Sequence, residues 1–358
     1  MNLKNIILFI VSIVLLGSVV YYIGINEVIS AVKQASPELL AVAVIINFAE
    51  FLVWNLKFKL LVDKTKKISY KSLFPVLMAG VFINNTTPGA RTGGGPVKAY
   101  FLSKILKKDK SECFAPVILD KTTNTIAFFS FIIISILFVF LFLDISGYMK
   151  IIFETFILVI AVIVVSGIVA RKRLKKKAGE MNKNKNNIIE KFLPKIYYFS
   201  LFKIIRKKFH TYALFEDFVI LGLERFIDSI SKLARDRKLL HHDFLLAVLI
   251  WLLIYLKTYV LFLSVGYDPG FMTVVIVVTL SIFLSSFMIV PGGIGAAEMS
   301  MIALYSASGV VAGVATMVSI VDRFIFYFFA LGLGYVCLMY VNVRYGGGGK
   351  DEKKDLEK

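Results

Sequence analysis

Long runs of apolar residues, separated by shorter segments rich in lysine and arginine, follow one another along most of this chain. A helix needs about 20 consecutive apolar residues to cross a hydrocarbon core about 30 Å thick. Several runs reach this length, which is more than a soluble core requires. The pattern therefore predicts a polytopic, all-α membrane helical bundle. We expect full spans at residues 5–25, 37–62, 112–143, 149–170, 243–265 and 310–342.

Two further apolar segments, 73–106 and 271–308, are interrupted near their centres by proline and glycine. Each arm, at roughly 14–19 residues, is short for a complete crossing. We expect each segment to enter the membrane, turn and leave on the same side as a re-entrant broken-helix hairpin. Two short complete crossings are the alternative. The residues expected to break the helices are Pro88, Gly89, Gly93, Gly94, Pro291, Gly292, Gly293 and Gly295.

The placement of lysine and arginine between the spans predicts how the chain is oriented. Cytoplasmic loops are enriched in these residues, which cluster after span 37–62, before span 112–143 and after span 149–170. The loops on the opposite side hold one cation, Lys33. We therefore expect a multi-pass protein of the cell membrane with both termini in the cytoplasm. The two hairpins would then open to opposite sides.

The two halves of the chain share a pattern that indicates an inverted repeat. Residues 37–143 and 243–342 each contain a full span, a broken hairpin and a second span that carries an acidic residue followed by a basic one. Asp120-Lys121 follows Pro88 by 32 residues, and Asp322-Arg323 follows Pro291 by 31 residues. Inverted repeats with broken helices at membrane depth are typical of transporters, because irregular backbone there must line a protein-walled or watery cavity.

The formal net charge is +18, and the lysines and arginines are concentrated above all in Arg171–Lys208, within the segment 171–242. We interpret this segment as a basic cytoplasmic part of a single integral membrane domain that comprises residues 1–358. Apolar residues recur at helical spacing from Tyr212 to Leu240, which predicts an amphipathic helix. The basic residues suit anionic lipid headgroups; no nucleic-acid-binding module is recognisable, so no nucleic-acid partner is expected. The tail 346–358 is expected to be disordered.

Charges at membrane depth are the candidate functional residues, because such charges are usually paired or functional. For Lys121 and Arg323, headgroup binding and a structural ion pair are both open, whereas Asp120 and Asp322 favour structural ion pairs. Glu50, in the middle of a span with Asn47 nearby, is a further buried carboxylate at which proton coupling is open.

Three more charges belong to the breaks themselves. Glu298 follows the second break in the first turn of the returning helix, where it either caps that helix or faces the cavity. Arg91 and Lys98 lie in and just after the first break, where they would attract an anionic headgroup or snorkel to the interface. Cys113, Cys337 and the three histidines form neither a disulfide framework nor a metal motif, so no metal and no cofactor is expected.

The stretch from Pro291 to Glu298 reads Pro-Gly-Gly-Ile-Gly-Ala-Ala-Glu. Together with Pro88-Gly89, Gly93-Gly94, Lys98, Asp120-Lys121 and Arg323, it resembles the lysylphosphatidylglycerol synthase transmembrane family, which is also described as flippase-like and includes the UPF0104 proteins. The resemblance covers nearly the whole chain. It implies a module that moves lipid between leaflets.

Some positions depart from the family pattern. The family usually has glutamate near the position of Gly95, arginine at the position of Lys98, and Glu-Arg at the positions of Asp120-Lys121. Lysine keeps the charge but lacks the bidentate fork of arginine. The soluble aminoacyltransferase domain of the family's synthases has no counterpart in this sequence, so we do not predict lipid synthesis.

We therefore expect a non-enzymatic lipid flippase that moves an anionic or amphiphilic membrane lipid. The candidate substrate-binding residues are Arg91, Lys98, Lys121, Glu298 and Arg323. A small-solute transporter is the alternative, followed by an integral-membrane lipid-linked transferase, for which the external loops offer few acidic residues.

Overall fold

A computed structural model of the chain describes residue 33 and residues 35–87, 93–142, 212–286 and 295–346. The described residues are helical, with no β-strand among them. The chain divides into two compact units, residues 1–135 with 226–358 and residues 136–225. The side-chain contacts and the cavity discussed below belong to the first unit. The predicted all-α membrane bundle is confirmed.

Four described helices are long and apolar enough to cross a membrane: Pro37–Val62, Lys110–Leu141, Arg237–Ser264 and Ala312–Tyr345. They are α3 (Pro37–Val62), α6 (Lys110–Phe142), α10 (Arg237–Ser264) and the continuous run α13 (Ala312–Tyr327), η3 (Phe328–Leu333) and α14 (Gly334–Tyr345). They coincide with four of the predicted spans. The other two, 5–25 and 149–170, lie outside the described residues, as does nearly all of the predicted tail.

Large apolar side chains remain exposed on these helices. Ile45 on α3, Phe324 on α13 and Val343 on α14 are each more than half exposed. A soluble monomer rarely exposes so many large apolar residues together. Their exposure is expected if these faces contact lipid.

The segment that was predicted as one amphipathic helix contains two helices. Helix α9 (Tyr212–Arg235) ends before Asp236, whose side chain accepts a hydrogen bond from the backbone N–H of Leu239 and so caps α10. The ammonium of Lys64 donates to the same carboxylate at 2.8 Å and holds the pKa of Asp236 below its ordinary value. Because aspartate is a favoured N-cap, the predicted boundary at Leu240 was wrong.

Each interrupted segment forms two short helices. The first consists of α4 (Tyr70–Thr86) and α5 (Gly94–Leu106), the second of α11 (Phe271–Ser285) and α12 (Ala296–Ala307). Even α4, with 17 residues, extends only about 26 Å at 1.5 Å per residue. None of the four is long enough for a full crossing of the hydrocarbon core. Both turns lie outside the described residues, so the re-entrant topology stays a prediction.

Glycine allows α4 and α5 to approach closely. A Cβ atom on Gly94 would lie 2.0 Å from the carbonyl oxygen of Gly80, which is far inside van der Waals contact. The backbone N–H of Gly94 donates to Oδ1 of Asn84 at 2.7 Å. The first backbone N–H groups of a helix have no acceptor within the helix, and the Asn84 side chain supplies an acceptor for one of them at the start of α5.

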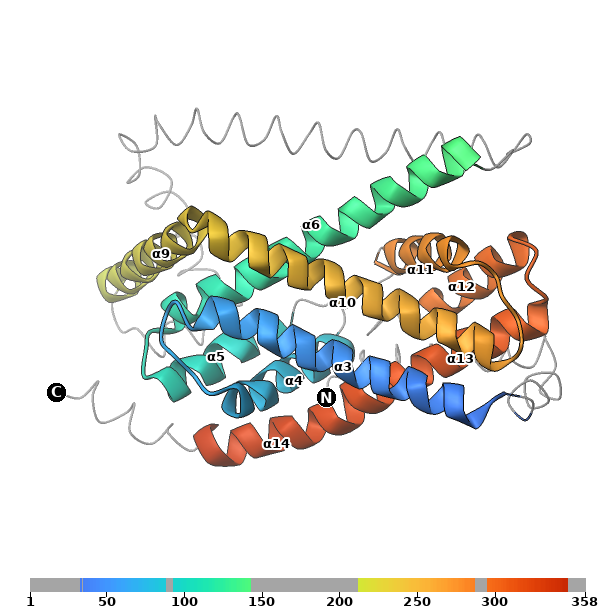
Figure 1. Ribbon diagram of the computed structural model, residues 1–358. Coiled ribbons are helices and arrows are strands. Elements are labelled where there is room, and N and C mark those ends of the chain that lie inside the picture. Colours follow the sequence, from blue (N-terminus) through green and yellow to red (C-terminus); the bar gives the residue numbers. More distant parts are fainter. Residues whose placement is uncertain (1–32, 34, 88–92, 143–211, 287–294, 347–358) are drawn as a thin grey trace. The chain divides into compact units, whose positions relative to one another are not determined.

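Helices α3 and α10 lie side by side and run antiparallel (Figure 1). The backbone N–H of Ser36, at the start of α3, donates to the carbonyl oxygen of Ser264, at the end of α10, at 2.7 Å. Lys64 and Asp236 join the opposite ends of the two helices. The first spans of the two predicted repeat halves therefore lie against each other in opposite directions.

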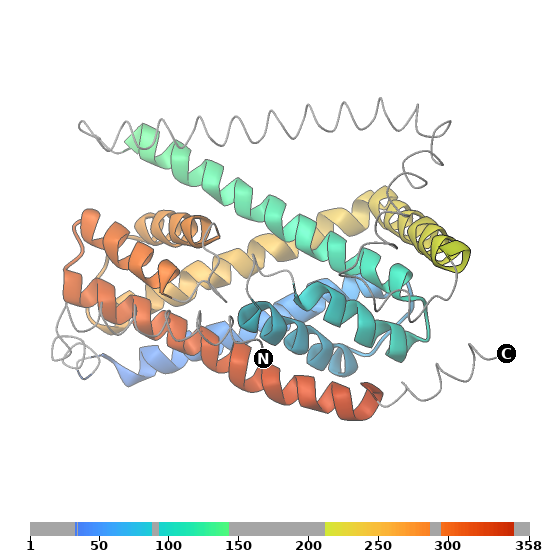
Figure 2. The same ribbon diagram turned by 180° about the vertical axis from the view of Figure 1, so that it is seen from behind.

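The last span packs against the hairpin formed by α4 and α5. Helix α14 runs alongside α4 (Figure 2), and a Cβ atom on Gly334 would lie 2.9 Å from Cβ of Phe82 and 3.1 Å from the carbonyl oxygen of Met78. Gly334 directly follows the π-helical turn η3, and such turns often occur at functional sites. The second half of the chain is thus packed directly onto the hairpin of the first.

Candidate functional site

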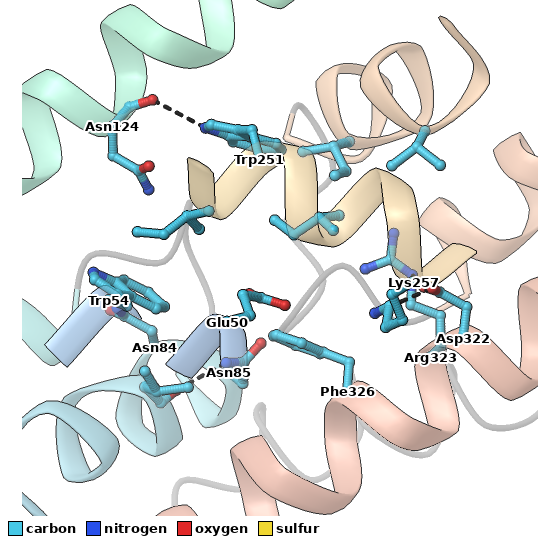
Figure 3. A pocket seen from close by; sticks show the side chains of 15 residues that line it. Glu50, Trp54, Asn84, Asn85, Asn124, Trp251, Lys257, Asp322, Arg323 and Phe326 are labelled. Atoms are coloured by element: carbon cyan, nitrogen blue, oxygen red, sulfur yellow. Dashed lines mark hydrogen bonds and ion pairs between the residues drawn. The ribbon is translucent and has the colours of Figure 1, made fainter. Parts of the chain in front are cut away.

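A cavity of about 120 Å³ lies between α3, α4, α6, α10, α11 and α13 (Figure 3). Its lining combines aromatic rings with amides and charges, at positions near the middle of the spans. Such polar groups are costly at membrane depth unless they serve a purpose. The polar and aromatic lining residues are Glu50, Trp54, Asn84, Asn85, Asn124, Trp251, Lys257, Asp322, Arg323 and Phe326.

Lys257 and Asp322 form a buried ion pair on one side of the cavity. The ammonium of Lys257 lies 3.1 Å from Oδ1 of Asp322, and both side chains are almost fully buried. The hydroxyl of Thr258 donates to the same oxygen at 2.8 Å. Lys257 also donates to Oδ1 of Asn47 at 3.4 Å. The carboxylate of Asp322 therefore has two donors of its own from α10.

Arg323 is buried beside this pair with weaker partners. Its Nε lies 3.9 Å from Oδ2 of Asp322, and its Nη2 lies 3.7 Å from the sulfur of Met301. A thioether is a weak acceptor, whereas a guanidinium has five donors. Within the described part of the chain, Nε has no hydrogen-bond partner. The described residues therefore leave Nε of this cavity-lining guanidinium without a hydrogen bond, and a planar oxyanion would match it.

Glu298 adopts the capping position. Its Oε2 accepts a hydrogen bond from the backbone N–H of Gly295 at 2.7 Å, three residues earlier, and the side chain is buried. Gly295 has a φ of 86°, a conformation that glycine adopts without strain. Glu298 does not line the cavity, although its charge lies within electrostatic range of Arg323.

A second group of buried charges joins α3, α6 and α10, and we call it the Lys57 cluster. The Lys57 ammonium lies 2.8 Å from Oδ1 of Asp120 and 3.3 Å from Oδ1 of Asp243. It also donates to the hydroxyl of Thr123 at 3.0 Å, and that hydroxyl donates to Oδ2 of Asp243 at 2.5 Å. The four side chains contact one another inside the bundle, and Oδ1 of Asp243 has the ion-pair contact to Lys57 but no hydrogen bond among the described residues.

Lys98 and Trp54 complete the Lys57 cluster. The Lys98 ammonium lies 3.2 Å from Oδ2 of Asp120 and 4.6 Å from the ring centre of Phe58, which is a favourable cation–π distance. The indole N–H of Trp54 donates to the same carboxylate oxygen at 3.3 Å. Since Trp54 also lines the cavity, its ring forms the wall between the cavity and the cluster.

The two groups of charges have matching connections. Lys57 on α3 pairs with Asp120 on α6, 63 residues later. Lys257 on α10 pairs with Asp322 on α13 at nearly the same separation. In each half, the span before the hairpin supplies lysine and the span after it supplies aspartate. This match supports the inverted repeat, which itself stays a prediction.

The structure brings together some of the predicted site residues and separates others. Asp120 and Lys98 meet in the Lys57 cluster, and Asp322 and Arg323 meet at the cavity. Lys121 is exposed on α6 and is not among the residues that line the cavity. Arg91 lies outside the described residues.

Sequence reasoning missed Lys57, Asp243 and Lys257. The two lysines lie inside apolar spans, and a charge in such a position is itself a signal of a paired or functional residue. Their nearly equal distances to the aspartates that follow would also have pointed to them. Asp243 is the first residue of its predicted span, a position at which the sequence alone suggests an ordinary residue of the membrane interface. Among the described residues, no group of three or more His, Cys, Asp or Glu side chains could hold a metal ion.

Comparison with known proteins agrees with this architecture. Residues 5–334 match the family described as the lysylphosphatidylglycerol synthase TM region. A UPF0104 membrane protein of Methanothermobacter thermautotrophicus is 27% identical over 342 residues, which cover 95% of this chain and 96% of the relative. UPF0104 membrane proteins of Pyrococcus horikoshii and Methanocaldococcus jannaschii are 27% and 26% identical over 94% of this chain, covering 97% and 95% of the relatives.

The family description refers to a transmembrane region, and neither it nor the names of these relatives indicates a catalytic domain. The match extends through both hairpins and all four described spans up to Gly334. The apolar helices, the polar cavity between them and this match lead to one conclusion. The chain is a membrane protein of the lysylphosphatidylglycerol synthase transmembrane region family.

Proposed function

We propose that this protein translocates a lipid with an anionic headgroup across the membrane, and that the cavity receives the headgroup. The observation that carries the proposal is the buried Arg323 guanidinium. Among the described residues its Nη2 donates to a thioether, and its ion pair with Asp322 is long, at 3.9 Å, with no hydrogen bond at Nε. Phosphate oxygens would supply the acceptors that the thioether does not. Lys257, on the facing helix, adds a second cation.

The architecture supports transport rather than fixed binding. Two hairpins of short helices, one in each half, pack beside the cavity-lining spans. In transporters, alternating access arises when one repeat moves against the other around such a midplane site. The acyl chains would remain in the bilayer, so that the cavity needs to hold only the headgroup. In this proposal both termini lie in the cytoplasm and the protein resides in the cell membrane.

The experiment is a lipid-movement assay on the full chain in liposomes. Fluorescent phosphatidylglycerol is placed in both leaflets, and an impermeant reductant reports how fast inner-leaflet lipid becomes accessible. Arg323→Ala should slow this movement by about 10- to 100-fold, because it removes charge-assisted hydrogen bonds of about 1.5–3 kcal/mol. The control is Arg344→Ala, which removes an exposed arginine at the end of the last span. Equal movement with wild type and Arg323→Ala would contradict the proposal.

One observation favours a second candidate. A cavity of about 120 Å³ suits a small anion better than a large headgroup in this conformation. Uptake of radioactive inorganic phosphate into the same liposomes, without movement of lipid, would indicate a small-solute transporter instead. Recovery of chemically altered lipid would indicate an enzyme.

A further inference from the structure

Two of the amides that line the cavity have oxygen atoms without a hydrogen bond. Oδ1 of Asn85, on α4, and Oδ1 of Asn124, on α6, are buried and accept no hydrogen bond among the described residues. The Asn85 side chain is only 5% exposed, and its Nδ2 donates to the carbonyl oxygen of Val81 at 2.8 Å. That bond identifies the other end of the amide as the acceptor. Because a buried acceptor without a donor is costly, both oxygens suit a ligand that brings donors.

The amides and the cations occupy different parts of the same cavity. Asn124 and Trp54 lie toward one side, and Lys257 and Arg323 lie toward the other (Figure 3). Asn85 comes from the first hairpin and contributes to the same lining. A phosphodiester that is bound at Arg323 can therefore extend the alcohol part of its headgroup toward the amides.

Both tryptophans of the chain, Trp54 and Trp251, line the cavity together with these amides. Their indole N–H groups are engaged elsewhere: Trp54 donates to Oδ2 of Asp120 at 3.3 Å, and Trp251 donates to the backbone carbonyl oxygen of Asn124 at 3.3 Å. The rings, rather than the N–H donors, are thus left to contact a ligand. The face of an aromatic ring is electron-rich, which suits the partly positive C–H groups of a polyol and disfavours a phosphate.

We propose that Asn85, Asn124 and the two indole rings form a hydroxyl-binding subsite, and that the lipid has a polyol headgroup. The amide oxygens accept hydrogen bonds from its hydroxyl groups while Arg323 binds its phosphate. Amide oxygens carry no net charge, so they match neutral hydroxyl donors. The inference rests on the proposed function and deepens it, since it names the class of lipid as a phosphodiester of glycerol or of a cyclic polyol such as inositol.

Short-chain lipids of equal charge test the subsite on the purified full chain in detergent. The headgroup of dihexanoyl phosphatidylmethanol has no hydroxyl group, that of dihexanoyl phosphatidylglycerol is a linear polyol, and that of dihexanoyl phosphatidylinositol is a cyclic one. Binding is followed by the fluorescence of Trp54 and Trp251, which both line the cavity. We expect at least one polyol lipid to bind about 10- to 30-fold more tightly than phosphatidylmethanol, the scale of two neutral hydrogen bonds. The tighter of the two identifies the polyol.

Variants assign the preference to the two asparagines. Asn85→Leu and Asn124→Leu remove the amide oxygens and nearly keep the side-chain volume. Each should lower the preference for the polyol lipid over phosphatidylmethanol by about 3- to 10-fold, a ratio that a general loss of folded protein does not change. Asn342→Leu is the matched control, since Asn342 is exposed on α14 and does not line the cavity. Arg323→Ala should weaken all of these lipids alike, because each carries the phosphate.

The outcomes separate the subsite from the proposed function. Equal affinity of the wild type for all of these lipids overturns the subsite and leaves the phosphate site at Arg323 standing. An unchanged preference in both asparagine variants overturns the assignment to Asn85 and Asn124. Tighter binding of dihexanoyl phosphatidylethanolamine than of either polyol lipid makes an ammonium the donor and overturns the polyol class. Failure of the wild type to bind any of them overturns the proposed function as well. If Asn85→Leu does not fold, the wild-type preference and Asn124→Leu still decide.

Discussion

Lys57 shows how a single buried charge is stabilised within this bundle. Its side chain is completely buried, and three oxygen-bearing side chains from two other helices surround its ammonium. Desolvation of an ion costs several kcal/mol, so a buried pair contributes little net stability, but removal of one partner leaves the other uncompensated. Two carboxylates, Asp120 and Asp243, depend on Lys57.

Lys57→Met should therefore destabilise the folded protein by about 3–5 kcal/mol, measured by unfolding in detergent. Lys59→Met is the matched control on the same helix. Lys59 pairs with Asp63 one turn away, where both side chains are about a quarter exposed, and such pairs contribute at most about 1 kcal/mol. Equal losses of stability in the two variants would show that the Lys57 cluster does not stabilise the fold in this way.

At the scale of elements, the hairpin of α4 and α5 depends on the contact at Gly94. The position has no room for a methyl group, because the carbonyl oxygen of Gly80 occupies it. The neighbouring Gly95 is different, since a Cβ atom there would lie 3.6 Å from the nearest atom, in the side chain of Val117. Two adjacent glycines thus have opposite tolerance for alanine.

Gly94→Ala should cost about 1–3 kcal/mol, the range for overpacking, and should reduce lipid movement because it separates the arms of the hairpin beside the cavity. Gly95→Ala should leave both properties close to those of the wild type. Unfolding in detergent and the liposome assay provide the two measurements. If Gly94→Ala is as well tolerated as Gly95→Ala, the close packing of the hairpin is not as described.

At the scale of the whole molecule, the antiparallel arrangement of α3 and α10 raises the question of orientation. The matched lysine–aspartate pairs support an inverted repeat, and the positive-inside rule predicts from the lysine-rich loops that both termini are cytoplasmic. On this prediction Ser111, at the start of α6, is cytoplasmic. Ser306, near the end of α12, is exposed and is predicted to face the outside.

Single cysteines at these two serines should react with an impermeant maleimide from opposite sides of the membrane. The native Cys113 and Cys337 are buried and are replaced by alanine in the background. In intact cells, only the cysteine at position 306 should be labelled, and the cysteine at position 111 should be labelled after the cells are opened. Labelling of both from one side would rule out the inverted repeat.

Much of the fold could be predicted because apolar length and helix-breaking residues are local properties. The span 37–62 coincides with α3, and both broken segments proved to be pairs of short helices. The candidate site was less accessible. Asp120 and Lys121 are adjacent in sequence, but neighbours on a helix point about 100° apart. Asp120 therefore faces the interior, whereas Lys121 is exposed.

The amino-acid sequence is sufficient to identify a helical membrane protein with two interrupted segments, because the cost of exposing backbone or charge to hydrocarbon leaves few other arrangements. Which charges meet could be seen only in the folded protein. Lys57 reaches Asp120 across 63 residues, and Glu50 shares a cavity with Arg323. Such contacts depend on how helix faces are turned toward one another in the packed bundle, which no local pattern of residues specifies.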